Sequence, residues 1–179
     1  MSQPTSQGRA MTTAIADVQS VFASRLDTLR QLLDKATAHF GDDTSFLSNR
    51  LAPDMHPLGA QIAFTCNQPR NFALWCDGRP ADNLDPEVAS VDQACRYIDD
   101  TRQRVHAVAA NDVKLDEIAR IDLGPGLHAD LPGSAYVHEF LIPNFYFHLV
   151  TTYAILRTGG LDIGKRDYMQ HLVPWVRQA

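Results

Sequence analysis

The sequence lacks the features that mark membrane, secreted or nucleic-acid-binding proteins. No window approaches the roughly 18 uninterrupted apolar residues of a membrane span, and residues 1–10 have no apolar core of a secretion signal. The Lys and Arg residues are scattered, with only Lys165 and Arg166 adjacent, and the formal net charge is -5 with a pI near 5.7. We therefore expect a cytoplasmic protein with no nucleic-acid partner and no membrane partner.

Cysteine is also scarce. Cys66, Cys76 and Cys95 are the three cysteines of the chain, an odd number, and none of them forms a CxxC pair. A disulfide framework or a four-cysteine zinc site is therefore not indicated. Reduced thiols are the expectation for such a chain in a cytoplasm.

What the sequence does contain is typical of one globular domain. It has 179 residues, of which 45% are hydrophobic and 21% charged, which is ordinary for a chain that buries its own core. Residues 1–11 are polar and are predicted to be a disordered leader, with Met11 as an alternative start. Residues 12–176 are predicted to form the single domain.

Helical spacing of apolar residues recurs in four segments, and the pattern predicts an all-α fold. The predicted helices are 12–40, 55–77, 86–111 and 134–158. Short breaks between them favour an antiparallel four-helix bundle. Asp54 is expected to cap the second helix, and Pro86 to occupy the first turn of the third.

Two shorter elements complete the prediction. Around Gly124–Pro125–Gly126 the helical period is lost, which indicates a small hairpin or extended loop before the last long helix. A short C-terminal helix is expected over 166–173, with Trp175 docked against the bundle.

The last long helix carries a polar stripe on an otherwise apolar surface. Asn144, His148 and Thr151 follow one another at intervals of four and three, so they share one face. On the second helix, Asp54, Gln61 and Gln68 are seven residues apart and form another such stripe. Unpaired buried polar groups cost about 1–3 kcal/mol each, so these stripes either line a site or pair with each other inside the core.

A metal site is one of the alternatives for these residues. His148 could be joined by His138, if the helix kinks at Pro143, and by Asp54 and His56 from the second helix. The opposing interpretation is a buried His148 that is hydrogen-bonded to Asn144 or to a neighbouring helix. The GxxxxGK pattern at 159–165 does not indicate a phosphate-binding loop, because Arg166 follows the lysine and the segment follows a helix.

Three separated motifs carry a resemblance to a known family. They are Arg50-Leu51-Ala52-Pro53-Asp54-Met55, Pro143-Asn144-Phe145-Tyr146-Phe147-His148, and Tyr153-Ala154-Ile155-Leu156-Arg157 with Gly164-Lys165-Arg166-Asp167-Tyr168. From about Thr13 to Tyr168 the chain resembles an uncharacterised bacterial family of DinB/YfiT-like four-helix bundles. The resemblance implies an antiparallel bundle that is often a homodimer.

The resemblance also implies a site. Many DinB-like relatives hold a divalent metal with three histidines, one from the second helix and an HxxxH pair from the last long helix, and some act as thiol transferases with bacillithiol or mycothiol. In this chain Asn144 stands at the first position of that pair, and only His148 matches the second. The corresponding region of the second helix offers Asp54, His56 and Gln61 instead of a clear histidine.

The leading hypothesis is a polar pocket between the second and fourth long helices that binds a small molecule. Its candidate binding residues are Asp54, His56, Gln61, His138, Asn144 and His148. The alternatives are a metal-dependent transferase or hydrolase that uses His148, and a non-catalytic interaction protein in which the stripes only fix helix register. We predict no tightly bound zinc or nickel ion, since His148 alone meets the relatives' ligand pattern.

Overall fold

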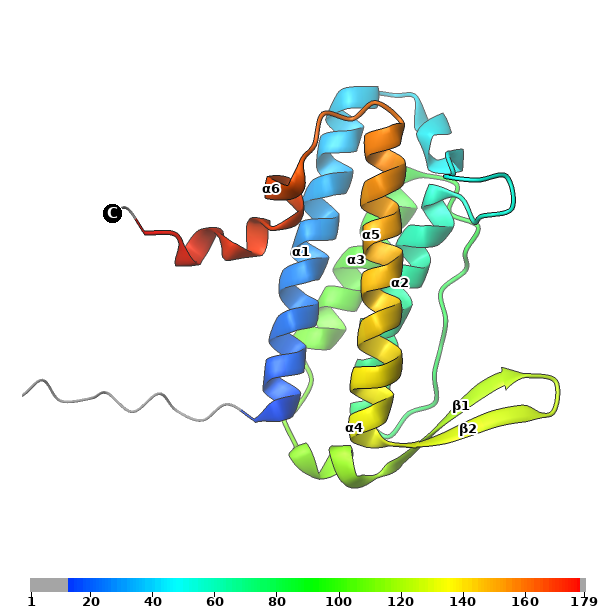
Figure 1. Ribbon diagram of the computed structural model, residues 1–179, viewed down its shortest axis with the longest axis vertical. Coiled ribbons are helices and arrows are strands. Elements are labelled where there is room, and N and C mark those ends of the chain that lie inside the picture. Colours follow the sequence, from blue (N-terminus) through cyan, green and yellow to red (C-terminus); the bar gives the residue numbers. More distant parts are fainter. Residues whose placement is uncertain (1–12, 178–179) are drawn as a thin grey trace, which may run out of the picture.

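The computed structural model describes residues 13–177, and four long helices form its bundle (Figure 1). These are α1 (Ala14–Phe40), α2 (Leu58–Cys76), α3 (Val91–His106) and α5 (Ile142–Thr158). Short 3-10 helices, η1 (Thr44–Ser48) and η2 (Asp112–Asp116), follow α1 and α3. The expected all-α bundle is confirmed, while the predicted leader at 1–11 lies outside the described residues.

Three phenylalanines hold the centre of the bundle together. The ring of Phe22 on α1 lies 5.3 Å from that of Phe72 on α2 and 5.1 Å from that of Phe145 on α5. All three side chains are fully buried. Tilted and edge-on aromatic pairs at this separation add about 0.5–1.5 kcal/mol each beyond the area they bury, so this cluster ties three of the four helices to one another.

The connection between α2 and α3 crosses back along the whole of α2. Its residues 77–90, here called the strap, are held by side chains of α2: Asn71 binds the backbone N–H of Asp82, and Asn67 binds that of Leu84. Further back along α2, Gly59 lies against Val88. As the strap proceeds, it therefore contacts progressively earlier residues of α2, and α3 begins at the same end of the bundle as α2 does.

Helices α2 and α3 both begin later than predicted, and the strap accounts for the start of α3. The third helix was predicted to start at Pro86 but starts at Val91, where the side chain of Ser90 accepts a hydrogen bond from the backbone of Gln93, because residues 85–90 are still crossing α2. Asp54 does not cap α2 as predicted. The N-cap position is Pro57, without a side-chain cap, and Asp54 lies exposed in the preceding turn.

The last long helix starts through two irregular turns. A short helix α4 (Gly133–Ala135) and a π turn, η3 (Tyr136–Leu141), lead directly into α5. Pro143 has no N–H to donate to the carbonyl group of Glu139, so regular α-helical hydrogen bonding cannot continue across this point. The predicted break near Pro143 is thus a π turn in the helix that leads up to it.

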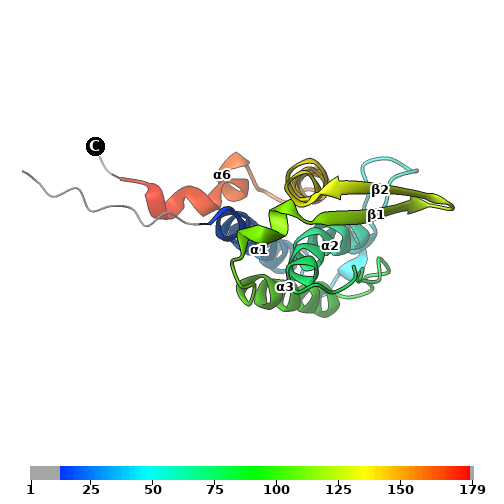
Figure 2. The same ribbon diagram turned by 90° about the horizontal axis from the view of Figure 1, so that it is seen from below.

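A two-stranded hairpin precedes this helix. The sequence predicted either a small hairpin or an extended loop here, and the hairpin is the one that forms. Strands β1 (Ile118–Gly124) and β2 (Leu127–Pro132) pair antiparallel around the Gly124–Pro125–Gly126 turn. Seen end-on, the hairpin extends across α2 beside α5 and projects past the bundle (Figure 2). Its outer half is solvent-exposed, including Leu123 and Leu127.

The C-terminal segment corrects one prediction. It forms a short helix α6 (Lys165–Tyr168) and a 3-10 helix η4 (Gln170–Trp175), which lies beside α1 at its start and extends outward from the bundle in Figure 1. Trp175 is 76% exposed, so it does not dock against the bundle. Residue spacing can predict a helix, but it does not predict which surface the apolar side chains of that helix will pack against.

None of the helices in the described part of the chain is both long and apolar enough to cross a membrane.

The close approach of the strap to α2 gives a test of this topology. A Cβ atom added at Gly59 would lie 2.9 Å from the carbonyl oxygen of Val88 and 3.0 Å from its Cβ. We expect Gly59→Ala to lower the free energy of unfolding by about 1–2 kcal/mol, since overpacking costs about 1–3 kcal/mol and alanine regains part of that in a helix. Urea denaturation followed by circular dichroism measures the change. Equal stability of Gly59→Ala and the unmodified chain would contradict the prediction.

Candidate functional site

The side chains of His148 and Gln61 meet between α5 and α2. Nδ1 of His148 lies 2.8 Å from Oε1 of Gln61, and Gln61 is only 2% exposed. The two polar stripes expected from the sequence therefore contact each other at these positions. His148 is half-buried, with one side of its ring against Phe64 at a centroid distance of 5.1 Å.

The hydrogen bonds of Gln61 fix the protonation of the imidazole. Nε2 of Gln61 donates to the backbone carbonyl oxygen of His56 at 3.3 Å, which orients Oε1 toward His148. An amide oxygen can only accept, so Nδ1 of His148 carries the proton and Nε2 carries a lone pair. Within residues 13–177, no hydrogen-bond partner of Nε2 is found.

The surroundings of His148 keep it neutral. Burial, and to a smaller extent electrostatic repulsion from nearby His56, lower its pKa to about 4. At neutral pH the ring is therefore an uncharged hydrogen-bond acceptor. A general base works best with a pKa near the operating pH, so this environment suits recognition better than proton transfer.

Two other predicted residues lie close to this pair. His56 also contacts the ring of Phe64, with 5.0 Å between the His56 and Phe64 centroids, and is itself exposed. Asn144 is one turn before His148 on α5 and is half-buried, but its Nδ2 donates to the carbonyl oxygen of Phe140 at 2.8 Å. Its amide thus bonds to its own helix.

The remaining two predicted residues lie apart from this contact. Asp54 is exposed in the turn before α2, and His138 is exposed on the π turn. Of the six predicted binding residues, His148 alone lines the cleft that opens beside it, and the other five do not.

That cleft has a volume of about 470 Å³ and is bounded by four segments of the chain. Its lining is Phe64, Asn67, Gln68 and Asn71 of α2; Ala81, Asn83, Leu84 and Pro86 of the strap; Arg120, Ile121 and Asp122 of β1; and Tyr136, Phe140 and His148. Aromatic and aliphatic side chains alternate with amides, and the two charged residues both come from the hairpin. Cavities of about 300–1,000 Å³ with mostly apolar walls and a few polar groups are typical of small-molecule sites.

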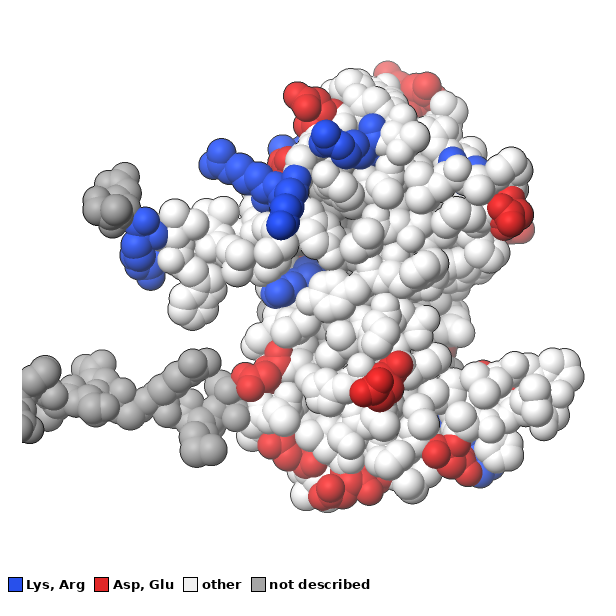
Figure 3. Space-filling view, viewed as in Figure 1, with Lys and Arg blue, Asp and Glu red and all other residues white. Residues whose placement is uncertain are grey.

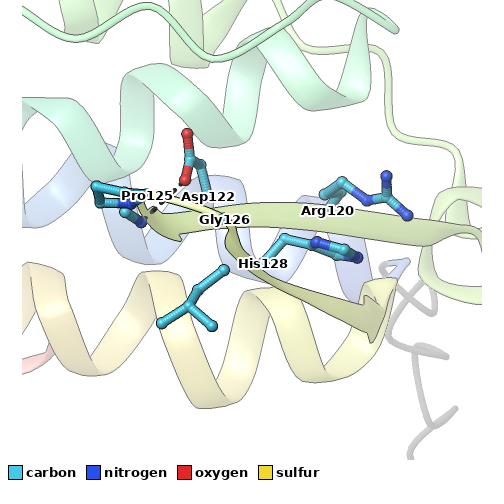
Figure 4. Close-up of a pocket in the computed structure, with 7 residues that line it drawn as sticks. Arg120, Asp122, Pro125, Gly126 and His128 are labelled. Carbon is cyan, nitrogen blue, oxygen red and sulfur yellow. Dashed lines mark hydrogen bonds between the residues drawn. The ribbon is translucent and has the colours of Figure 1, made fainter.

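A second hollow, of about 610 Å³, lies at the hairpin turn. Figure 4 shows Arg120, Asp122 and His128 around the Gly124–Pro125–Gly126 turn. Arg120 is already bound to Asp130 by two hydrogen bonds, of 2.7 and 2.8 Å, on the paired strand, and Asp122 accepts from the backbone of Gly124. This hollow is the more open of the two, and its charged groups are satisfied, so the His148 cleft is the better candidate.

Sequence reasoning missed most of the cleft lining. Gln68 was part of the predicted α2 stripe and does line the cleft, where Nε2 donates to its own helix at 3.5 Å and Oε1 has no partner among the described residues. Asn83 and Arg120 could not be found in this way. They arrive through the strap and the hairpin, whose positions depend on long-range packing.

Potential metal ligands are not grouped in the part of the chain that the structure describes. Among residues 13–177, no three His, Cys, Asp or Glu side chains are placed to hold a metal ion together. The three cysteines are free, and burial raises the pKa of the Cys66 and Cys76 thiols to about 12. They are therefore protonated at neutral pH and poor nucleophiles.

Comparison with known proteins gives a family and a fold. A family profile described as a domain of unknown function (DUF1993) matches residues 16–169. The chain is similar to a solved DinB family member protein from Shewanella denitrificans, with 28% sequence identity and a TM-score of 0.74, over 86% of this chain and 90% of that one. The comparison with curated proteins gave no match.

The depressed pKa of His148 makes stability depend on pH. The unfolded imidazole has a pKa near 6.5, so below that value the unfolded state binds the proton more readily than the folded state, whose pKa is about 4. The free energy of unfolding is therefore independent of this group above about pH 6.5 and falls as the pH drops toward 4. The expected decrease is about 1–2 kcal/mol, after allowance for the partial solvent exposure of His148. Urea denaturation at several pH values should show this loss, and His148→Gln should reduce the slope. The exposed control His138→Gln should keep it, and equal slopes in the two variants would contradict the assignment.

The amide at position 61 is expected to control the charge of His148. Gln61→Glu places a carboxylate against Nδ1, and an adjacent opposite charge raises the pKa of a histidine by about 1–3 units. Titration followed by NMR of the imidazole resonances measures this shift. Gln31→Glu, on the exposed side of α1, adds the same charge elsewhere and should leave the titration of His148 unchanged. If Gln61→Glu also leaves it unchanged, the contact is not as described.

Proposed function

From the premise that the chain belongs to the DUF1993 family and has a DinB-like helical fold, we propose that it binds an uncharged small molecule in the His148 cleft. One observation carries the proposal. Nε2 of His148, a residue that lines the cleft, carries a lone pair in a neutral ring whose tautomer Gln61 fixes. The ligand group that such an atom selects is an N–H or O–H donor.

The remaining walls describe the rest of the ligand. Phe64, Tyr136 and Phe140 provide aromatic surface, which favours a flat, partly apolar molecule. The free Oε1 of Gln68 is a second acceptor. A charged ligand would lose hydration in such a cleft without a buried opposite charge to compensate. Arg120 is paired with Asp130, Asp122 accepts a hydrogen bond from the backbone N–H of Gly124, and both charged side chains are exposed. The proposed class is therefore neutral heteroaromatic compounds with a ring N–H or O–H.

A screen with defined probes tests this proposal. A set of uncharged heteroaromatic lactams and amides is matched with carboxylated and aminated analogues, and binding is followed by NMR of the protein's imidazole and side-chain amide groups. We expect the uncharged members to bind and to shift the resonances of His148 and Gln68. His148→Leu should weaken binding about 5- to 100-fold, from the loss of about 1–3 kcal/mol for one hydrogen bond to a buried partner.

A second histidine provides the control for this experiment. His138→Leu changes an exposed histidine just before the same helix and should leave affinity unchanged. Binding that is equal in His148→Leu, or that is confined to charged probes, would refute the proposal. Loss of stability in His148→Leu with no probe bound by the unmodified chain would favour the interaction-protein alternative, in which the pair only fixes helix register.

The metal-dependent transferase or hydrolase needs a different ligand set. Catalytic zinc usually has three protein ligands, whereas His148 is bonded to an amide and no three potential ligands are grouped in residues 13–177. We expect elemental analysis after dialysis against a mild chelator to find far less than one zinc or nickel ion per chain. About one ion per chain, lost in His148→Ala, would instead support the transferase.

A further inference from the structure

Asn67 is a buried amide that lines the His148 cleft. Its side chain is only 5% exposed, and its Oδ1 accepts a hydrogen bond of 2.8 Å from the backbone N–H of Leu84 on the strap. A backbone N–H can only donate, so the oxygen of the amide is the atom that faces the strap. This bond fixes the side chain and leaves both N–H donors of Nδ2 for another partner.

The contact with the strap does not account for the nitrogen of Asn67. Nδ2 has no hydrogen-bond partner among the described residues, although buried polar groups are nearly always paired. The amide of Asn71, one turn later on α2, differs in this respect. Its Oδ1 accepts from the backbone of Asp82, and its Nδ2 donates to Oδ1 of Asn83. Asn67 is therefore a fixed donor that the fold itself does not use.

Tyr136 brings a second donor of this kind to the cleft. Its side chain lines the cleft and is 7% exposed, and its hydroxyl group forms no hydrogen bond with any described residue. The rings of Trp75 and Phe140 pack against it, with centroid distances of 5.4 and 5.9 Å. Burial raises the pKa of Tyr136 to about 12, so the hydroxyl group keeps its proton at neutral pH.

The surface near the cleft carries few charges. In Figure 3 the basic side chains gather around α6, and the surface beside α5 and above the hairpin is largely uncharged. Recognition of a ligand in the cleft therefore depends on matched hydrogen-bond donors and acceptors. The cleft offers both kinds: the acceptor Nε2 of His148, and the donors of Asn67 and Tyr136.

We propose that Asn67 binds a carbonyl oxygen of the ligand through Nδ2, in addition to the ligand donor that His148 accepts. The inference rests on the proposed function and narrows the ligand to heteroaromatic lactams, which are uncharged rings with both an N–H and a C=O group. A site built to hydrogen-bond one group of a ligand rejects analogues that lack it, because its own buried polar groups are then left unpaired. Asn67 thus distinguishes a lactam from a ring with an N–H group alone.

Three uncharged bicyclic probes test this distinction on the full chain. The isomers 2-quinolone and 4-quinolone carry an N–H and a C=O group at different separations, and indole carries the N–H group alone. We expect at least one quinolone to bind about 5- to 100-fold more tightly than indole, which is the effect of one hydrogen bond to a buried group. Calorimetric titration measures the ratio, and NMR should show a shift of the Asn67 side-chain amide resonances on quinolone binding.

Asn67→Asp is the matching variant. It keeps an oxygen for the backbone N–H of Leu84 and replaces the Nδ2 donors with an acceptor, so the preference for the quinolone should disappear. Asn111→Asp is the control, because Asn111 also binds a backbone N–H, that of Val113, through Oδ1, but is exposed and lies outside the cleft. It should keep the preference. The NMR shift of Asn67 needs no variant, so the test stands even if Asn67→Asp does not fold.

The outcomes separate this inference from the proposed function. Indole binding and its weakening in His148→Leu depend on the proposed function alone. If indole binds in this way but the quinolones bind no more tightly, or if Asn67→Asp folds and keeps their preference, the carbonyl contact is overturned and the proposed function stands. If no probe binds, or if His148→Leu leaves the binding of all three unchanged, the proposed function fails as well.

Discussion

The packing of the strap against α2 is the contact on which the position of α3 and the shape of the cleft depend. Helices α2 and α3 run in the same direction, so the chain between them must return along the length of α2 before α3 can begin. Asn67 and Asn71 hold it by binding backbone N–H groups of the strap, and Arg70 binds the carboxylate and the carbonyl oxygen of Asp82. These polar residues on α2 satisfy an extended backbone that would otherwise lack partners.

The cleft follows from the same contact. With the strap on one side of α2 and α5 on the other, part of α2 remains uncovered between them, and the hairpin extends over it (Figure 2). The cleft is thus lined by segments that meet only in the folded chain. His148, whose tautomer is fixed, lies on helix α5 of the bundle. It is positioned by the buried amide of Gln61 on the neighbouring helix α2.

The sequence predicted what depends on local spacing and missed what depends on long-range packing. Apolar periodicity located the four long helices, and the two polar stripes placed His148 near Gln61, because residues on one helix face must meet whatever packs there. The starts of α2 and α3 were misplaced. Pro57 and not Asp54 is the N-cap of α2, and α3 begins only after Ser90 because the strap includes Pro86. The same limit applies to the cleft. Arg120 reaches it only because the hairpin folds across α2.

The π turn before α5 sets the rotational phase of the whole helix. Val137, Leu141, Phe145 and Leu149 are all fully buried and are spaced by four residues. At 3.6 residues per turn, each step of four overshoots one full turn by about 40°, so three successive α-helical steps would rotate Leu149 well away from the direction of Val137. The wider π turn winds the first step back in the opposite sense. One irregular turn therefore keeps a four-residue repeat aimed at the core, and it also determines which residues of α5 remain on the outside.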